Sequence, residues 1–271
     1  MHILPESAWR EFRGAPKKPG QNPTTHQALI ADQEGKEHKC YVKAAWHGSP
    51  MPLTEALAWI LAGALDLPRP EFAALLILPM PLLREHVQLD DPQFQVPSTL
   101  AFCSSTIDGR HIHGPWRWLT HLRTARAFQH KDVSRIAAFD EWAQNQDRHL
   151  GNFLRRRGGG YVPIDNEYVL YGLLWDALLR SMGGGVAHQS VRQAARGVLN
   201  SGAYTRFEAS MVLASMEHEA ALLKAATSLR QFVCAFVADP ATGAALADAV
   251  LQFLTNRAHR DWLANELGVI V

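Results

Sequence analysis

The chain has 271 residues, of which 47% are hydrophobic, enough to bury the core of one large domain or of two smaller lobes. Its 27 lysine and arginine residues nearly balance 26 aspartate and glutamate residues, so the formal net charge is +1. This balance argues against a protein that binds nucleic acid or anionic membrane through bulk charge and leaves open only a local basic patch, so we expect neither partner. The cysteines Cys40, Cys103 and Cys234 are odd in number and widely spaced, which favours a reducing environment over a disulfide framework.

The sequence has no segment suited to cross a membrane. Its N-terminus lacks the basic start and the continuous apolar stretch of a signal peptide. The longest apolar run, residues 72–83, contains Pro79 and Pro81 and is shorter than the roughly 20 residues that a spanning helix needs. We therefore expect a soluble, cytoplasmic protein.

The first part of the chain, residues 1–103, has the pattern of a small β-rich lobe. Residues 32–36 between the first two strand-like segments form a good hairpin turn, because Gly35 is free to adopt a positive φ. The pattern predicts strands at Gln27–Ala31, Lys39–Ala44 and Phe72–Leu78.

One helix is expected inside this lobe, from Thr54 to Leu65. Thr54 is suited to cap it, and Glu55 suits the first turn, where a negative charge is favourable. Apolar residues then repeat at helical spacing, and Pro68 and Pro70 end the helix.

The second part, residues 104–271, has a mostly helical pattern. Pro115 suits the first turn of a helix that reaches about Phe128, and Asp132 or Ser134 is suited to cap a second that reaches Trp142 or Ala143. Further helices are predicted at 173–182, 188–198, 206–226, 228–238, 240–256 and 259–267. The chain thus reads as a small β-rich lobe followed by a larger, mostly helical lobe.

The polar stretch from Asn145 to Asn152 is the part of the sequence that is hardest to explain by folding alone. It follows a predicted helix and precedes two short strand-like segments, Phe153–Arg155 and Tyr161–Ile164, which a glycine-rich turn connects. Asp165 stands directly after the second segment. Polar residues therefore gather where a helix meets a hairpin, with an acid at the far end of that hairpin.

Phosphoryl transfer requires residues of this kind. A carboxylate must accept the proton of the acceptor hydroxyl, and oxygen ligands must hold Mg²⁺ on the nucleotide phosphates. Asp147 and Asn152 have the spacing of a kinase base and its metal-binding asparagine, and Asp165 follows one hairpin later. The structural alternative is that these side chains only order a polar loop through hydrogen bonds to the backbone.

The string Asp147-Arg-His-x-Gly-Asn152, with Ile-Asp165 after a hairpin, resembles the catalytic loop of the HipA-like kinases and of the related phosphatidylinositol 3- and 4-kinases. The resemblance implies an α+β, two-lobed, atypical protein-kinase-like fold. It also implies that Asp147 is the base or orienting acid and that Asn152 and Asp165 bind Mg²⁺. His149 would either bind phosphate or brace the loop.

The N-terminal lobe contains a matching lysine and glutamate. Kinases use a lysine on an inner strand to contact the ATP phosphates and a helical glutamate to hold that lysine. Lys43 and Glu55 fit these two places. The stretch from Glu55 to Pro70 is similar to the HipA-like pattern of a helix that ends in Leu-Gly-Leu-Pro-x-Pro, with Asp66 in place of the glycine.

Other nucleotide contacts are less marked in the sequence. No G-x-G-x-x-G precedes Lys43, so we assign the phosphate cover to the loop of residues 20–25, with Thr24 and Thr25 as hydroxyl donors. Residues 102–105 are expected to be the hinge between the lobes, with Phe102 and Ser104 beside the adenine. The resemblance covers about residues 25–170.

Three further features of the sequence are explained by packing or solvent exposure more simply than by a functional role. His111 and His113 resemble a metal-binding pair but have no third ligand nearby in sequence. Residues 155–157, three arginines beside glycines, are interpreted as a solvated hairpin, with contact to an acidic substrate as the alternative. Trp116 and Trp118 are expected to pack within a helix.

The resemblance implies an ATP- and Mg²⁺-dependent kinase that acts on serine or threonine of a protein substrate, with an antitoxin or other regulatory protein as a partner. Phosphorylation of a phosphoinositide lipid is the first alternative. The second is a pseudokinase that binds nucleotide and regulates a partner. The presence of Lys43, Asp147, Asn152 and Asp165 together favours an active enzyme over a pseudokinase.

Overall fold

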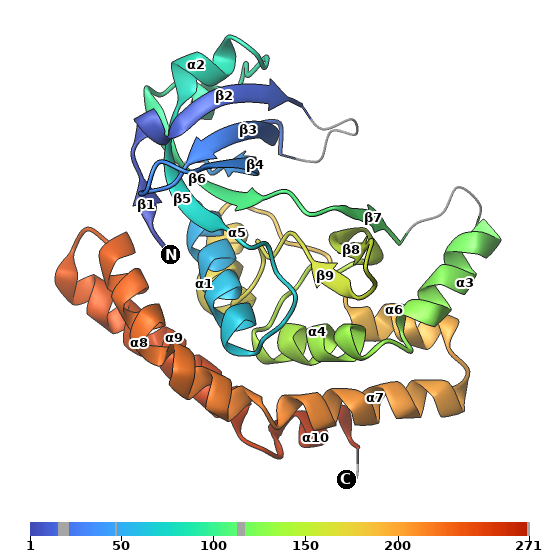
Figure 1. The fold of residues 1–271 in the computed structure, drawn as a ribbon. Coiled ribbons are helices and arrows are strands. Elements are labelled where there is room, and N and C mark those ends of the chain that lie inside the picture. The colour runs from blue at the N-terminus through green and yellow to red at the C-terminus, as the bar shows by residue number, and fades with distance from the viewer. Residues whose placement is uncertain (16–21, 47, 113–116, 270–271) are drawn as a thin grey trace. The chain divides into compact units, whose positions relative to one another are not determined.

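The structure is a computed structural model that describes residues 1–15, 22–46, 48–112 and 117–269. The chain divides into two compact units, Met1–Ala56 with Pro70–Ile107 and Leu57–Arg69 with Asp108–Val271. The first unit is built on a β-sheet and the second is mostly helical, which confirms the expected α+β class (Figure 1). No helix in the described ranges is long and apolar enough to cross a membrane.

The first unit contains a six-stranded sheet with the order β1-β5-β6-β4-β3-β2. Strand β1 is parallel to β5, and the other neighbours are antiparallel. The strands are β1 (Ile3–Leu4), β2 (Trp9–Gly14), β3 (His26–Ala31), β4 (Glu37–Ala44), β5 (Ala73–Pro79) and β6 (Ser98–Ser105). Short helical turns are η1 (Glu6–Ala8), α2 (Met80–Arg84) and η2 (Pro92–Phe94).

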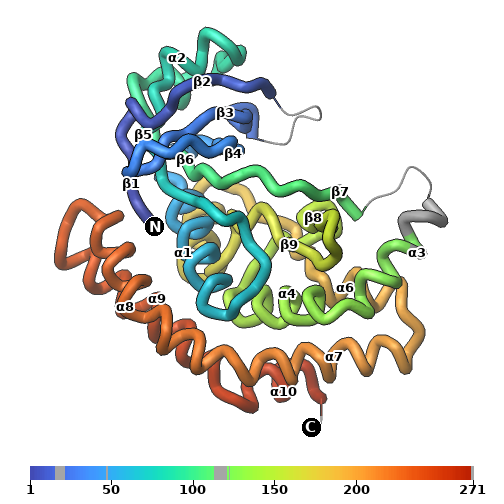
Figure 2. Tube along the Cα trace, in the orientation of Figure 1, coloured from blue at the N-terminus to red at the C-terminus, as the bar shows by residue number. Residues whose placement is uncertain are grey.

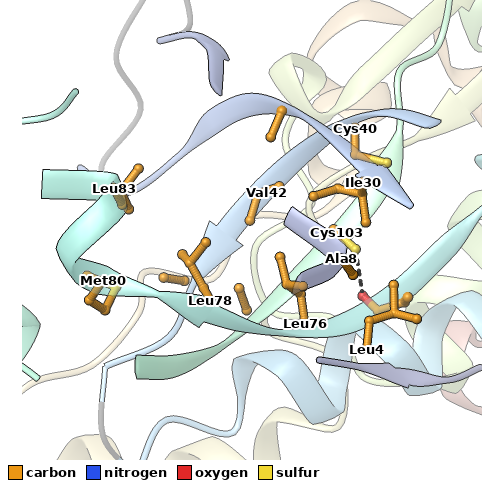
Figure 3. Packing of buried hydrophobic residues seen from close by; sticks show 14 of the residues in the cluster. Leu4, Ala8, Ile30, Cys40, Val42, Leu76, Leu78, Met80, Leu83 and Cys103 are labelled. Atoms are coloured by element: carbon orange, nitrogen blue, oxygen red, sulfur yellow. Dashed lines mark hydrogen bonds between the residues drawn. The ribbon is translucent and has the colours of Figure 1, made fainter. Parts of the chain in front are cut away.

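One face of this sheet carries the core of the unit (Figure 3). Side chains alternate between the two faces of a strand, so every second residue of β4 and β6 points into the core. Cys40 and Val42 of β4 and Cys103 of β6 are fully buried there. Met80 and Leu83 of α2 join the same cluster, which closes this face of the sheet.

Local turn chemistry positions the β3–β4 hairpin as the sequence predicts. Gly35 has a φ of +81°. Oδ1 of Asp32 accepts hydrogen bonds from the backbone amides of Glu34 (3.0 Å) and Lys36 (2.9 Å).

Residues 102–105, where the hinge between the lobes is expected, belong to strand β6. It pairs with β4 and β5 on its two sides and is therefore an interior strand.

Helix α1 spans Met51–Ala64 and so begins three residues before the expected Thr54. Thr54 is not its cap: its hydroxyl donates to the carbonyl of Met51 (3.0 Å), while the Ser49 hydroxyl accepts from the Met51 amide (3.2 Å). At the other end Asp66 has a φ of +51°. Asp66 thus adopts the left-handed conformation for which glycine is usual after a helix.

The second unit contains a three-stranded sheet of order β7-β8-β9, made by β7 (Gly109–His111), β8 (Phe153–Arg156) and β9 (Tyr161–Pro163). Helices α8 and α9 lie side by side in its C-terminal part (Figure 2). The helices are α3 (Arg117–Ala127), α4 (Lys131–Trp142), η3 (Leu150–Asn152), η4 (Tyr171–Trp175), α5 (Asp176–Ser181), α6 (Val191–Val198), α7 (Ser201–Ser215), α8 (His218–Phe236), α9 (Pro240–Ala258) and α10 (Trp262–Leu267).

Two expectations about these helices were wrong. The helices predicted at 206–226 and 228–238 have their break in the wrong place, because the chain breaks at residues 216–217 between α7 and α8, and α8 continues to Phe236. Helix α4 is capped by His130, whose side chain accepts from the backbone amide of Asp132, and not by Asp132 or Ser134. Pro115, His113 and Trp116 lie outside the described residues, so the expectations about them are untested.

Candidate active site

The polar stretch of residues 145–152 links α4 to β8, and a buried ion pair holds it. Nε of Arg148 donates to both carboxylate oxygens of Asp140, at 3.2 and 3.0 Å, and Nη2 donates to Oδ1 at 3.1 Å. The Arg148 side chain has no exposed area and Asp140 is 6% exposed. Burial raises the pKa of the Asp140 carboxyl, and the positive charge of Arg148 partly offsets that rise.

Arg148 also connects this stretch to the segment after β9. Its Nη1 donates to the carbonyl oxygen of Ile164 at 2.5 Å, and its Nη2 donates to the side chain of Asn166. Ile164 and Asn166 flank Asp165 in sequence. One guanidinium therefore contacts both residues that flank Asp165, the backbone of Ile164 and the side chain of Asn166, and also holds the loop that carries Asp147.

One oxygen of the Asp147 carboxylate makes no hydrogen bond to any described residue. Its Oδ1 atom is buried, and no hydrogen-bond partner for it exists within the part of the chain that the structure describes. A buried polar atom without a partner costs free energy, so such atoms in folded proteins call for a reason. An external hydroxyl group that donates to this oxygen would satisfy its hydrogen-bonding capacity.

Asn152 is buried, and its side chain is already oriented. Its side-chain nitrogen Nδ2 donates to the backbone carbonyl of Asp147 at 3.1 Å. The side-chain oxygen Oδ1 is the atom of this amide that can bind a cation. The backbone carbonyl of Asn152 accepts from the amide of Ile164 at 2.9 Å. Asn152 and Asp165 therefore lie at the same open end of the β8–β9 hairpin.

Asp165 is exposed and has a φ of +60°. Outside glycine, only Asp66, Gln144, Asp165 and Leu170 have a positive φ among the described residues. Three of these four border the loop of Asp147 or the segment after β9. Backbone strain of this kind concentrates at functional sites, where the surrounding structure has to hold it.

His149 braces the loop. Its Nδ1 accepts from the backbone amide of Gly151 at 3.0 Å and thereby caps the short helix η3. A neutral ring that accepts at Nδ1 carries its proton at Nε2. Of the two roles considered for His149, the structure gives evidence for the bracing role, and phosphate contact stays a prediction.

In the first unit, three of the expected nucleotide residues share one face of the sheet. Lys43 is directly opposite Phe102, and Tyr41 is directly opposite Ser104, in the β4–β6 register. Opposed residues of an antiparallel pair lie on the same face, so Lys43, Phe102 and Ser104 all lie on the face away from the core cluster. The β6 backbone is paired on both sides, so nucleotide contacts by Phe102 and Ser104, still a prediction, would come from their side chains.

Thr24 has a structural contact. Its hydroxyl is fully buried, donates to Oδ1 of Asn22 (2.6 Å) and accepts from the amide of Ala44 (2.9 Å), the residue after Lys43. Thr25 follows and is half-buried. Residues 20 and 21 of the expected phosphate cover lie outside the described residues. The phosphate contacts of Thr24 and Thr25 therefore stay predictions.

Glu55 lies in α1 and is 4% exposed. A carboxylate so well buried needs a charged or hydrogen-bonding partner. Lys43 is half-buried in the same unit. Its expected pairing with Glu55 stays a prediction.

Sequence reasoning missed the residues that support the loop of residues 145–152. Asp140 was read only as part of a helix, and Asn145, whose Nδ2 donates to Asp140 at 3.0 Å, only as a loop residue. Arg257 of α9 was not considered. It donates to the carbonyls of Trp142 (2.9 Å) and Glu141 (2.8 Å) at the end of α4. An acid on the otherwise apolar face of α4 was the available signal for Asp140.

The described residues contain no cluster of three or more His, Cys, Asp or Glu side chains that could hold a metal ion. An asparagine with one aspartate is a different donor set, made of the hard oxygen ligands that Mg²⁺ prefers. Mg²⁺ commonly completes its shell with water and nucleotide phosphates. The residue types at the end of the β8–β9 hairpin thus fit Mg²⁺ bound together with a nucleotide.

The sequence matches no family model and no curated protein. Among solved structures, the chain is similar to the Helicobacter pylori proinflammatory kinase CtkA, with 12% identity over 91% of this chain and 96% of that one and a TM-score of 0.47. It is also similar to HipA of Shewanella oneidensis, from a complex with HipB and operator DNA, with 13% identity over 97% and 69% of the two chains and a TM-score of 0.48. A third similar structure is the MAP kinase LmaMPK10 of Leishmania major, with 11% identity over 93% and 78% and a TM-score of 0.32.

Proposed function

We propose that the chain is an ATP- and Mg²⁺-dependent kinase that transfers the γ-phosphate to a hydroxyl group, and specifically to serine or threonine of a protein substrate. The observation that carries the proposal is the buried, partnerless Oδ1 of Asp147, next in the fold to Asn152 and in a loop held by Arg148. The loop supplies a carboxylate of unsatisfied hydrogen-bonding capacity in a rigid frame. A kinase needs that combination where the acceptor hydroxyl is positioned.

Asp147 orients the acceptor hydroxyl and takes its proton. The acceptor oxygen forms a bond to the γ-phosphorus while the bond from that phosphorus to the bridging oxygen breaks, and ADP leaves. Asn152 and Asp165 would hold Mg²⁺, which neutralises charge on the phosphates. In the first unit Lys43 would contact the phosphates, with Glu55 as its partner.

The direct test is to incubate the purified protein with a cell lysate, Mg²⁺ and ATP labelled at the γ-phosphate, and to identify the labelled species. We expect labelled protein serine or threonine, and labelling by Asp147→Asn protein that is slower by roughly 10²-fold or more. Label in lipid alone would indicate a lipid kinase. Tight binding of Mg-ATP with no labelled product of any kind would indicate a pseudokinase and overturn the proposal.

A further inference from the structure

An unusual row of residues crosses the three-stranded sheet of the second unit, in which β7, β8 and β9 lie side by side (Figure 1). Arg110 of β7 is directly opposite Arg155 of β8, and Arg155 is directly opposite Tyr161 of β9. Directly opposed residues share a face, with Cβ atoms about 5 Å apart. Two like charges are thus held side by side, an arrangement that destabilises a sheet unless an anion lies between them.

A third arginine, Arg126 of α3, adds positive charge to the same region. Burial raises the pKa of the Tyr161 hydroxyl, and the positive charges of Arg155 and Arg126 act against that rise. Tyr161 is 6% exposed, whereas Arg110, Arg126 and Arg155 are all exposed. Arg110, Arg126 and Arg155 are called here the arginine cluster, of which Arg110 and Arg155 are directly opposed on β7 and β8.

The nearby carboxylates are engaged elsewhere. Oδ2 of Asp132 accepts from the backbone amide of Tyr161 at 2.9 Å, and Asp108 lies 3.6 Å from Arg157. In the ranges that the structure describes, none of the three arginines of the cluster has an acidic partner within 4.0 Å. The cluster therefore offers guanidinium donors to an external anion, and Arg forks match carboxylates well.

The strands that carry the cluster also border the candidate active site. Nδ1 of His111, which follows Arg110 and so lies on the opposite face of β7, contacts the carbonyl oxygen of Gly151 at 2.9 Å. Strand β8 spans Phe153–Arg156, so Arg155 is three residues beyond Asn152, about 10 Å along the chain at the 3.3 Å rise of a strand. An extended peptide covers that distance in about three residues.

We propose that the arginine cluster binds an acidic segment of the protein substrate, about three residues away from the phosphorylated serine or threonine. The position of the acceptor rests on the proposed kinase function, whereas the binding of an acidic segment does not. A short acidic peptide suits the site better than a nucleic acid, because the cluster is small and the net charge of the whole chain is only +1. Of the three successive arginines at residues 155–157, Arg155 is the one directly opposite Arg110 in the β7–β8 register.

The test measures peptide binding by the full-length protein without nucleotide, using fluorescence anisotropy. The probe is a labelled peptide with one serine and a short run of glutamates about three residues from it, compared with the same peptide carrying glutamines. The test variant is Arg110→Gln/Arg155→Gln. The control, Arg156→Gln/Arg157→Gln, removes the same amount of charge from the same hairpin. Thermal melting verifies that both variants remain folded.

We expect the acidic peptide to bind more tightly than the glutamine peptide, and the test variant to weaken it roughly tenfold, with the control within about twofold of wild type. Equal losses in both variants, or equal binding of the two peptides, would overturn the proposal. So would an oligouridine that binds more tightly than the acidic peptide and loses binding in the test variant, since the cluster would then be a nucleic-acid surface. Because no nucleotide is present, a protein that lacks kinase activity can still pass this test.

Discussion

Arg148 and Asp140 form an ion pair with almost no access to solvent, and the loop of Asp147 depends on it. The guanidinium donates to both carboxylate oxygens and, on its other side, to the backbone before Asp165. The side chain of Arg148 thus links the loop of residues 145–152 to helix α4 and to the segment after β9. This geometry explains why an arginine stands beside the candidate catalytic aspartate.

We expect Arg148→Met to lower the free energy of unfolding by about 3–5 kcal/mol, because it leaves the Asp140 carboxylate buried without its partner. The double variant Asp140→Leu/Arg148→Met removes both charges and should be less destabilised than the single one. Urea unfolding followed by circular dichroism measures both. A loss below about 1 kcal/mol in the single variant would mean that the pair is solvated in solution.

Asp147→Asn should separate nucleotide binding from catalysis. The substitution preserves shape and most hydrogen bonds but removes the basic oxygen that the acceptor hydroxyl needs. We expect near-normal affinity for Mg-ATP and a rate of phosphotransfer reduced by roughly 10²-fold or more. Calorimetric titration and labelled-phosphate transfer measure the two quantities on the same preparation. Wild-type transfer rates in this variant would reduce Asp147 to a residue that orders the loop.

Asp165 allows metal binding and backbone strain to be separated by two substitutions at one position. Both Asp165→Ala and Asp165→Gly remove the carboxylate, so both should lose the Mg²⁺-dependent part of the thermal stabilisation by ATP. Only glycine accepts a φ of +60° without cost, so without nucleotide we expect Asp165→Gly to be more stable than Asp165→Ala by about 1 kcal/mol. If either variant is stabilised by Mg-ATP as fully as wild type, Asp165 is not a metal ligand.

His218 should make the protein sensitive to acid. Its ring stacks on Trp142 at 4.5 Å, and burial lowers its pKa from 6.5 to about 3. Below about pH 6.5 the unfolded chain binds a proton that the folded protein does not bind until about pH 3. The free energy of unfolding should therefore fall as the pH falls through this window, by about 1.4 kcal/mol per pH unit from this group.

The matched variant for this pH effect is His218→Phe, which retains an aromatic ring beside Trp142 and cannot titrate. We expect its free energy of unfolding to depend less steeply on pH than that of wild type between about pH 6.5 and pH 4. Urea unfolding at a series of pH values gives both slopes. Identical slopes would show that the pKa of His218 is the same in the folded and the unfolded protein.

The sequence by itself determined the features that depend on neighbouring residues. The turn at Gly35 and the helix end at Asp66 follow from local backbone preferences. The candidate site could be predicted because Asp147 and Asn152 belong to one loop and Asp165 follows one hairpin later, so that a local pattern brings all three to the same end of β8 and β9. Strands β3, β4 and β5 were predicted within two residues at each end for the same reason.

Only the tertiary structure decided what depends on distant partners. Strand β6 was not predicted, because its neighbours in the sheet, β4 and β5, are distant in sequence and pairing with them overrides local preference. The bond from Arg257 to the end of α4 joins residues more than a hundred positions apart. Arg110 and Arg155 become neighbours only through the β7–β8 register, since no local pattern records which residue of one strand faces which residue of another.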